Sequence, residues 1–367
     1  KDRLKALLTL SPSVILVGVF VYGFIGNTLW YSLTDWGGVA ALAENPVRHF
    51  IGLTNYVDLF TGFLGGGFRQ DLVNAVFYSV LLLGGAVGLG LIIAILLDQK
   101  PHGEDFLRTV FLYPMSLSFI VTGTIWRWML SPQGGVNALP RYLGMQPLTF
   151  GWLTSHEAVL RFNWQNLLPI GLNILSVILI LIGLCGLRKN ARRAVLRWLG
   201  PGALLGALVW FFGDLLPQAL MMKEMHGFNL ATVGIIMATV WQYSGYTMAL
   251  YLAGLTGISQ DLRDAAMLDG ASNVGYYRFV AIPMLKPITI SAVIILSHIS
   301  LKMFDLIFAM TGPDNAATGH PALRMYLTTF RANDFAQGAA IAMVLFFVAA
   351  LFIVPYLVGS YRQRRSR

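Results

Sequence analysis

Long apolar stretches separated by polar connections dominate the chain. A helix needs about 20 mostly apolar residues to cross the hydrocarbon core of a bilayer. Eight stretches approach or exceed this length, and the period-two alternation of a membrane β-barrel is absent from them. The predicted spans are 10–33, 73–97, 109–130, 168–187, 200–216, 230–256, 288–310 and 338–359. The pattern therefore predicts an all-α fold, a polytopic transmembrane helical bundle of about 8 spans.

The composition agrees with a lipid-facing surface. Hydrophobic residues make up 56% of the 367 residues, charged residues only 12%, and the mean hydropathy is +0.66. A soluble domain carries about 25% charged residues, so this chain has too few to cover a surface that faces water. The single cysteine, Cys185, excludes an intramolecular disulfide and a cysteine-built metal cluster. The chain begins with Lys1 rather than Met, so we expect its natural start to lie upstream.

Basic residues predict the orientation. Eight spans put both termini on one side, and most of the 26 Lys and Arg residues then fall in the short connections of that side. This bias marks the cytoplasmic side, so both termini are expected in the cytoplasm. The turn 188–197 supports 200–216 as a real span, because its five basic residues would otherwise lie outside. The basic tail Arg362–Arg367 is interpreted as a contact with anionic membrane lipid, not as a nucleic-acid arm.

Three regions follow from these spans. Residues 1–72 hold the first span and a periplasmic loop, residues 73–359 form the core, and residues 360–367 are the basic cytoplasmic tail. The core includes an extra helical hairpin at about 168–216 and a long cytoplasmic loop at 257–287.

The cytoplasmic loop has its own helical pattern. Ser259 is a suitable N-cap for a short helix, Gly270 interrupts the pattern, and Pro283 and Pro287 are expected to end a second piece. We expect a short helix, a glycine bend and a second short helix that returns to the membrane. Small residues leave one surface nearly flat, so another protein could approach the backbone closely. These residues are Ala265, Ala266, Gly270 and Ala271, with Arg263, Asp264 and Asp269 at the rim.

The same loop resembles a family motif. Asp264-Ala265-Ala266, then Gly270, then Val280-Ala281-Ile282-Pro283 resembles the Glu-Ala-Ala loop of bacterial ABC-importer permeases, with Asp for the usual Glu. The resemblance implies a coupling helix that sits in a cleft of a separate ATPase subunit. The implied ATPase-coupling residues are Asp264, Ala265, Ala266, Gly270 and Pro283.

Other segments narrow the resemblance to carbohydrate importers of the maltose, α-glucoside and glycerol-phosphate type, and to the larger maltose-permease subunit. They are Phe50–Tyr56, Tyr113-Pro114, Trp126-Arg127-Trp128, Gly134–Asn137, and Lys302–Asp305 leading to Thr311-Gly312-Pro313. The resemblance implies a type I ABC-importer permease fold in a bacterial inner membrane. It also implies a second permease subunit, an ATPase dimer, a periplasmic solute-binding protein and a sugar substrate.

Polar groups inside predicted spans indicate a solute path, because they are costly in lipid unless they are paired or wet. One cluster lies in the sixth span, where Gly245 is expected to bend the helix. A second lies in the seventh span, where Lys302 and Asp305 are spaced to pair, and the third span adds Ser116 and Ser118 near Pro114. The candidate substrate-lining residues are Thr239, Trp241, Gln242, Tyr243, Tyr246, Ser300, Lys302, Met303 and Asp305, of which Met303 comes from the resemblance. Packing aromatics and a structural Lys–Asp pair remain the alternative.

Motifs for chemistry are missing from the sequence. It has no P-loop, no His-Glu-x-x-His and no Gly-x-Ser-x-Gly. We expect no catalytic residue, metal or cofactor on this chain, with ATP and Mg on the partner ATPase. The leading hypothesis is one permease half of an ATP-driven sugar importer. A secondary transporter is the alternative, although the internal repeat typical of that class is not evident. A membrane-embedded enzyme would need a reactive constellation that we do not find.

Overall fold

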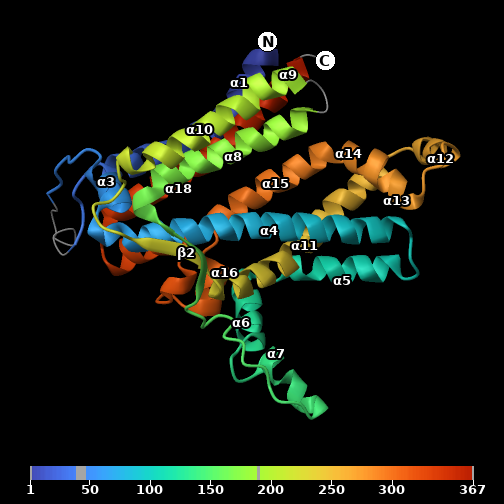
Figure 1. The fold of residues 1–367 in the computed structure, drawn as a ribbon, viewed down its shortest axis with the longest axis horizontal. Coiled ribbons are helices and arrows are strands. Elements are labelled where there is room, and N and C mark those ends of the chain that lie inside the picture. Colours follow the sequence, from blue (N-terminus) through green and yellow to red (C-terminus); the bar gives the residue numbers. More distant parts are fainter. Residues whose placement is uncertain (1, 39–46, 188–190, 366–367) are drawn as a thin grey trace. The chain divides into compact units, whose positions relative to one another are not determined.

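The computed structural model describes residues 2–38, 47–187 and 191–365 (Figure 1). The chain divides into two compact units, one formed by Lys1–Val159 with Phe228–Arg367 and the other by Leu160–Gly227. The second unit contains the predicted hairpin.

The first unit is built from helices. In chain order they are α1 (Asp2–Val17), η1 (Gly18–Gly23), α2 (Phe24–Ser32), α3 (Thr54–Thr61), η3 (Phe63–Gly65), α4 (Gly66–Asp98), α5 (Glu104–Ser116), α6 (Phe119–Met129), α7 (Gly135–Ala138), η4 (Leu139–Leu143), α11 (Ala231–Thr256), α12 (Gln260–Leu268), α13 (Asn273–Tyr276), η8 (Tyr277–Ala281), α14 (Ile282–Met284), α15 (Lys286–Leu301), α16 (Asp305–Thr311), η9 (Ala316–Thr318), α17 (Pro321–Tyr326), η10 (Leu327–Arg331) and α18 (Phe335–Arg365).

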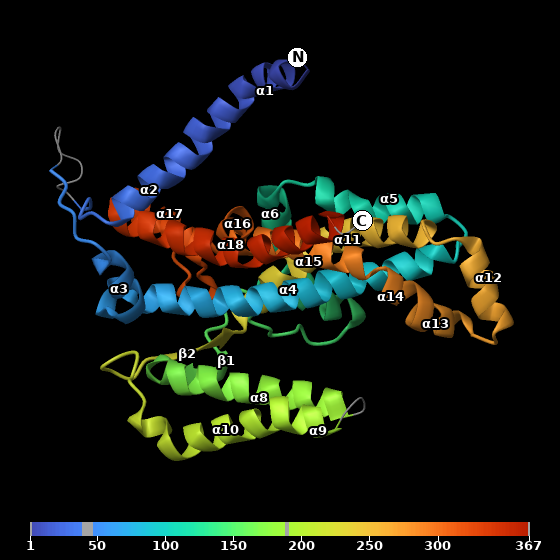
Figure 2. The ribbon, with the colours of Figure 1, turned by 90° about the horizontal axis from the view of Figure 1, so that it is seen from above.

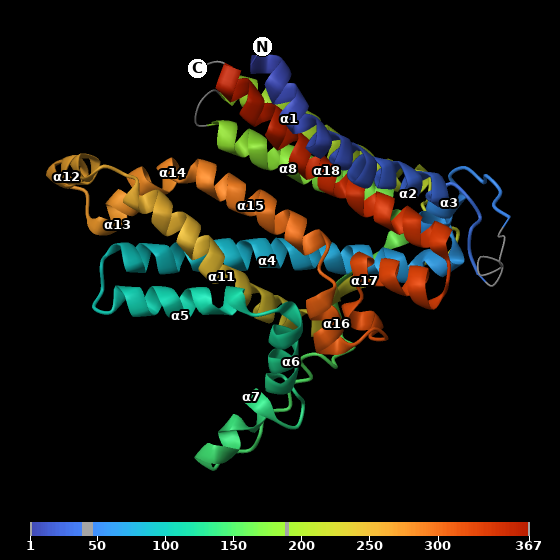
Figure 3. The same cartoon turned by 180° about the vertical axis from the view of Figure 1, so that it is seen from behind.

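Helices α4 and α11 form the centre of this unit (Figure 3). Their contact is apolar, with two hydrogen bonds inside it. The Tyr78 hydroxyl and Thr239 Oγ1 lie 2.8 Å apart, and Thr247 Oγ1 donates to the Ala86 carbonyl at 2.6 Å. Such bonds satisfy polar groups that burial would otherwise leave unpaired, so they fix how α4 sits against α11.

Length and apolar composition alone do not yield the predicted eight spans. Among the described residues, five helices are long and apolar enough to cross a membrane, and two bent pairs raise the number to at most seven. The predicted span 230–256 is present as the 26-residue helix α11, which is long enough to cross a membrane but is not one of these five. The count of eight is therefore not confirmed.

Two predicted spans are broken. The stretch 109–130 forms α5 and α6, which meet at an angle of 101°. Pro114 lies near the end of α5, Leu117 is extended, and the Ser118 hydroxyl caps α6 by accepting from the Val121 amide. The stretch 288–310 is likewise interrupted after Lys302, before α16 begins at Asp305. Apolar length alone does not reveal such local stop signals.

The segment Phe50–Tyr56 anchors the end of α2 through polar side chains. The Asn55 amide donates to the carbonyls of Ser32 and Thr34, at 2.9 and 2.8 Å, and Ser32 Oγ lies 2.6 Å from the Tyr56 hydroxyl. These bonds tie the end of α2 to the start of α3. The segment therefore holds the exit of the first predicted span in place.

The second unit is a helical hairpin. Its elements are η5 (Trp164–Asn166), α8 (Leu167–Leu187), α9 (Ala191–Ala194), η6 (Val195–Leu199), α10 (Gly200–Phe212) and η7 (Gly213–Leu215). Both predicted spans of the hairpin are confirmed as apolar helices of membrane length. Ser176 Oγ donates to the Gly202 carbonyl across the hairpin at 2.8 Å. Part of the basic turn, residues 188–190, lies outside the described residues.

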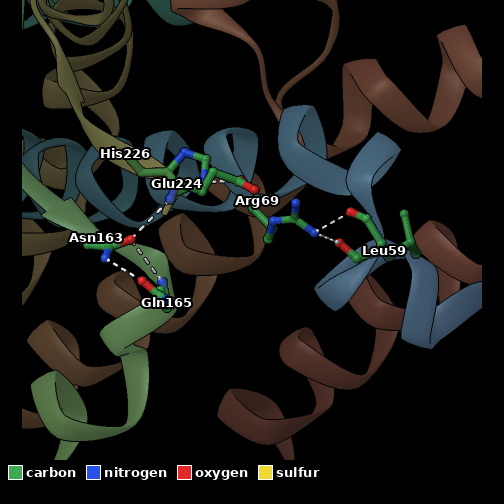
Figure 4. A network of polar contacts seen from close by, with 7 residues as sticks. Leu59, Arg69, Asn163, Gln165, Glu224 and His226 are labelled. Carbon is green, nitrogen blue, oxygen red and sulfur yellow. Dashed lines mark hydrogen bonds and ion pairs between the residues drawn. The ribbon is translucent and has the colours of Figure 1, made fainter. Parts of the chain in front are cut away.

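Strands β1 (Ala158–Asn163) and β2 (Met225–Asn229) pair where the chain enters and leaves the hairpin. Figure 4 shows the bonds that hold the strand ends of this unit. The Asn163 side-chain oxygen accepts from the amides of Gln165 and Glu224, at 3.2 and 3.1 Å, and His226 lies 2.5 Å from the Glu224 carboxylate. In the first unit, the same figure shows Arg69 bonded to the Leu59 carbonyl.

Candidate functional site

The bend between α5 and α6 opens a cavity of about 570 Å³ in the first unit. Its wall comes from the bend itself, from α11 and α15, and from the first residue of α16. In Figure 1, α6 turns away from the direction of α5 at this point. The break that the apolar pattern did not predict is thus what shapes the cavity.

Polar groups from α11 face this cavity. Gln242 Nε2 donates to the Leu117 carbonyl at 3.1 Å, which satisfies an acceptor freed by the bend. Gln242 Oε1 is buried and has no hydrogen-bond partner in the described part of the chain. Tyr243 and Tyr246 line the cavity beside Gln242, and the Tyr243 ring lies 6.2 Å from the Phe119 ring. An unpaired acceptor between aromatic rings suits a ligand with hydroxyl donors and apolar C–H faces.

Asp305 adds a carboxylate to the same cavity, while Ile295 and Ile299 form its apolar side. Among the described residues, no ion pair joins Lys302 and Asp305. The helix break after Lys302 removes the regular i, i+3 geometry on which their pairing was predicted. The structural-pair alternative for these two residues is therefore wrong.

The cavity unites four of the nine candidate residues: Gln242, Tyr243, Tyr246 and Asp305. The others lie elsewhere. Thr239 is fully buried against Tyr78, and Ser300 Oγ lies 2.8 Å from Ser79 Oγ. The remaining candidates are Met303, which is buried in the core, Trp241, whose ring packs edge-on against Trp126, and Lys302, which is exposed. Contact of any of them with a solute stays a prediction.

Sequence reasoning missed the backbone carbonyl of Leu117 and the ring of Phe119. Pro114 followed by a capping serine, Ser118, is the signal that could have placed them, because a proline and a new N-cap inside an apolar stretch mark a broken helix. Gly245 was expected to bend α11, and α11 continues through this position without a break. The missing side chain instead lets α5 approach, since a Cβ on Gly245 would lie 1.9 Å from the Phe111 carbonyl oxygen.

The long loop forms the predicted helix, bend and second helix. Helix α12 has no buried residue, and Gly270 follows it with φ +84°, a conformation that suits glycine. Ala271 donates to the Ala266 carbonyl at 2.9 Å, which closes the end of α12. The small residues Ala265 and Gly270 are exposed, so the surface is open to a partner.

One detail of this loop differs from expectation. Ser259 occupies the N-cap position of α12, but its side chain makes no capping bond. The second piece ends at Met284, directly after Pro283, as expected, and Pro287 lies in the first turn of the next helix, α15. A proline is tolerated there since the first amides of a helix have no intrahelical acceptor.

A protein-family model described as "Binding-protein-dependent transport system inner membrane component" matches residues 86–367. The chain is 33% identical, over 97% of its length and 95% of the relative's, to a probable ABC transporter permease protein of Pyrococcus horikoshii. It is 29% identical to a xylose/arabinose import permease protein of Haloferax volcanii, over 95% of this chain and 86% of the relative. It is 26% identical to a trehalose/maltose transport system permease protein of Thermococcus litoralis, over 97% and 94%.

Among solved structures, the chain resembles one from a bacterial alginate ABC transporter in complex with an alginate pentasaccharide-bound periplasmic protein. The TM-score is 0.64 at 14% identity, covering 96% of this chain and 93% of the other. The likeness shows that the fold is shared.

Proposed function

Because the chain belongs to the family of binding-protein-dependent transport system inner membrane components, we propose that it is one permease half of an ATP-driven sugar importer. The loop formed by α12, Gly270 and α13 carries the proposal. In it, an exposed helix is followed by a glycine bend, and the loop lies beside the C-terminal end of α4 (Figure 2). Sugars are the proposed substrate because two relatives are named for sugar import, and because the cavity offers aromatic rings beside hydrogen-bond acceptors.

The chain supplies a path, and a partner supplies the energy. A separate ATPase dimer, with ATP and Mg, docks on Asp264, Ala265, Ala266, Gly270 and Pro283. Its closure moves α12, and the movement switches the cavity between inward and outward access. A second permease completes the cavity, and a periplasmic solute-binding protein delivers the sugar to the outer loops.

The membrane orientation rests on two contacts. Ala336, at the start of α18, donates to the Trp36 carbonyl just after α2, at 2.8 Å. The first and last spans therefore run antiparallel, which supports both termini on one side. Asp98, at the end of α4, contacts Arg263 of the long loop. With the positive-inside bias, we place that loop and both termini in the cytoplasm, and the chain in the inner membrane.

A secondary transporter is not supported, since the family consists of components of binding-protein-dependent transport systems. An ATP-driven importer and a secondary transporter differ in their energy source, so an uptake assay distinguishes them.

The test is reconstitution in lipid vesicles with the second permease, the ATPase and the solute-binding protein. Radiolabelled maltose, trehalose and xylose are offered in turn. We expect ATP-dependent uptake of at least one sugar, and none with ADP. A Gln242→Leu variant should lower uptake, while Gly84→Ala, at a site where a Cβ meets nothing within 4 Å, should not. Uptake that proceeds without ATP or without the ATPase would refute the proposal.

A further inference from the structure

One carboxylate at the cytoplasmic end of α4 gathers three elements. Asp98 Oδ2 accepts from the Tyr277 hydroxyl at 2.5 Å and lies 3.4 Å from Arg263 Nη1. Asp98 belongs to the membrane helix α4, Arg263 to α12, and Tyr277 to the helical segment that returns to the membrane.

The Arg263 guanidinium lies against two aromatic rings. Its Cζ is 5.1 Å from the Tyr276 ring centroid and 5.8 Å from that of Tyr277. A planar guanidinium can stack on such rings while it bonds a carboxylate, whereas an ammonium cannot do both in the same geometry. The side chains of Arg263 and Asp98 are 25% and 13% exposed, so water screens this pair less than a surface pair.

Helix α12 has little else to hold it. It contains no buried residue, and among the described helices it packs chiefly against α13. Arg263 and Ala266 are its partly buried positions that touch the body of the bundle, Arg263 through Asp98 and Ala266 through the apolar cluster under the loop. Arg263 therefore gives α12 a direct polar tie to the membrane helix α4.

Helix α4 continues from this point along α11, which forms part of the cavity wall. Asp98 is its last residue, and the same helix bonds α11 through Thr247 and, further along, through Tyr78. Helix α11 carries Gln242 and Tyr243 of the cavity. Asp98 thus joins the loop to α4, whose packing partner α11 lines the candidate solute site.

We propose that Asp98, Arg263 and Tyr277 form a junction that transmits movement of α12 to α4, and so couples the ATPase to the cavity. The three are positioning residues, since none of them touches the cavity. This inference rests on the proposed function, because transmission has a purpose only if an ATPase moves α12.

The first measurement needs no sugar. Hydrogen exchange is followed over residues 260–276 in the full chain assembled with its partner subunits. We expect Arg263→Ala to speed exchange about tenfold, because α12 loses its tie to α4. Tyr277→Phe should also speed exchange, because the returning segment loses its bond to Asp98. Arg278→Ala is the matched control, since this neighbouring guanidinium lies over the ring of Phe279 alone among the described aromatic rings. Equal exchange in all variants would overturn the junction.

The second measurement is the number of ATP molecules hydrolysed per sugar taken up, with the sugar that the wild type transports. Asp98→Asn, Arg263→Lys and Tyr277→Phe should raise this ratio about 2- to 30-fold, the range in which residues between coupled sites act. A merely structural defect would lower hydrolysis and uptake together. A wild-type ratio in all three variants would overturn the coupling role. If the wild type transports none of the sugars, the proposed function fails, while the exchange measurement still decides whether the junction holds α12.

Discussion

Replacing Gly245 by alanine tests how α5 packs on α11. A Cβ at this position would lie 1.9 Å from the Phe111 carbonyl oxygen, 2.8 Å from its carbon and 3.2 Å from the Leu112 Cα. All three atoms belong to backbone. Non-bonded heavy atoms rest at about 3.5 Å, so α5 has to withdraw by roughly 1.5 Å. The Gln242–Leu117 bond at the end of α5 opposes that movement.

Two terms set the size of the effect. Alanine in place of glycine favours an exposed helix interior by about 1 kcal/mol. Overpacking costs typically about 1–3 kcal/mol, and a clash with backbone belongs at the upper end. Gly84 is the matched control, because it also lies within a long helix and a Cβ there meets nothing within 4 Å. Subtracting the control removes the helix term, so Gly245→Ala should be less stable than Gly84→Ala by about 2–3 kcal/mol.

The assay is thermal unfolding of the full chain in detergent, with the folded fraction measured by size-exclusion chromatography after heating. A chain of this size should show a midpoint at least about 4 °C lower for Gly245→Ala than for Gly84→Ala. Sugar uptake should fall in the same variant, because the wall of the cavity moves. Equal midpoints would refute the close approach of α5 and α11.

Three further predictions concern single positions. Gly270→Val should impair coupled uptake more than Gly270→Asn, because φ +84° costs a β-branched residue more than asparagine; equal uptake in reconstituted vesicles would contradict this. Tyr78→Phe should lower the free energy of unfolding by about 1 kcal/mol in a chemical titration, since Thr239 keeps its bond to the Ile235 carbonyl; a loss above about 3 kcal/mol would mean that the hydroxyl has another role. Burial lowers the pKa of His320 from 6.5 to about 4, so the unfolded chain takes up the proton first and stability falls as the pH drops from about 6.5 towards 4. His320→Asn keeps a side-chain acceptor for the N-cap of α17 but removes the titrating group. Thermal midpoints of this variant, measured between pH 6.5 and 4, should therefore fall less than those of the wild type.

Local sequence patterns predicted much of the architecture. The apolar stretches located the membrane helices, and the five basic residues of the turn 188–197 supported the second helix of the hairpin, which the structure confirms. The loop 257–287 was also predictable, because Gly270 is a local signal that needs no distant partner. These features depend on residues a few positions apart, which is the range that a sequence pattern reports.

The candidate cavity was only partly predictable. The polar cluster of α11 was visible, and Gln242 and Tyr243 do face the cavity. Thr239, from the same cluster, is instead paired with Tyr78, which lies 161 positions away along the chain. Which face of a helix meets a neighbour and which meets a cavity depends on helix rotation. The polar residues of α11 do not follow one face, so they give little periodic signal for its rotation.

The sequence by itself determined that the chain is a bundle of membrane helices and that it carries an exposed loop with a glycine bend, because hydrophobicity and backbone preference act locally. Only the tertiary structure decided where the helices break, which polar side chains face the cavity, and that Asp98 meets Arg263 and Tyr277. Those contacts join residues more than 160 positions apart. They arise from close packing of helices, whose partners no local pattern identifies.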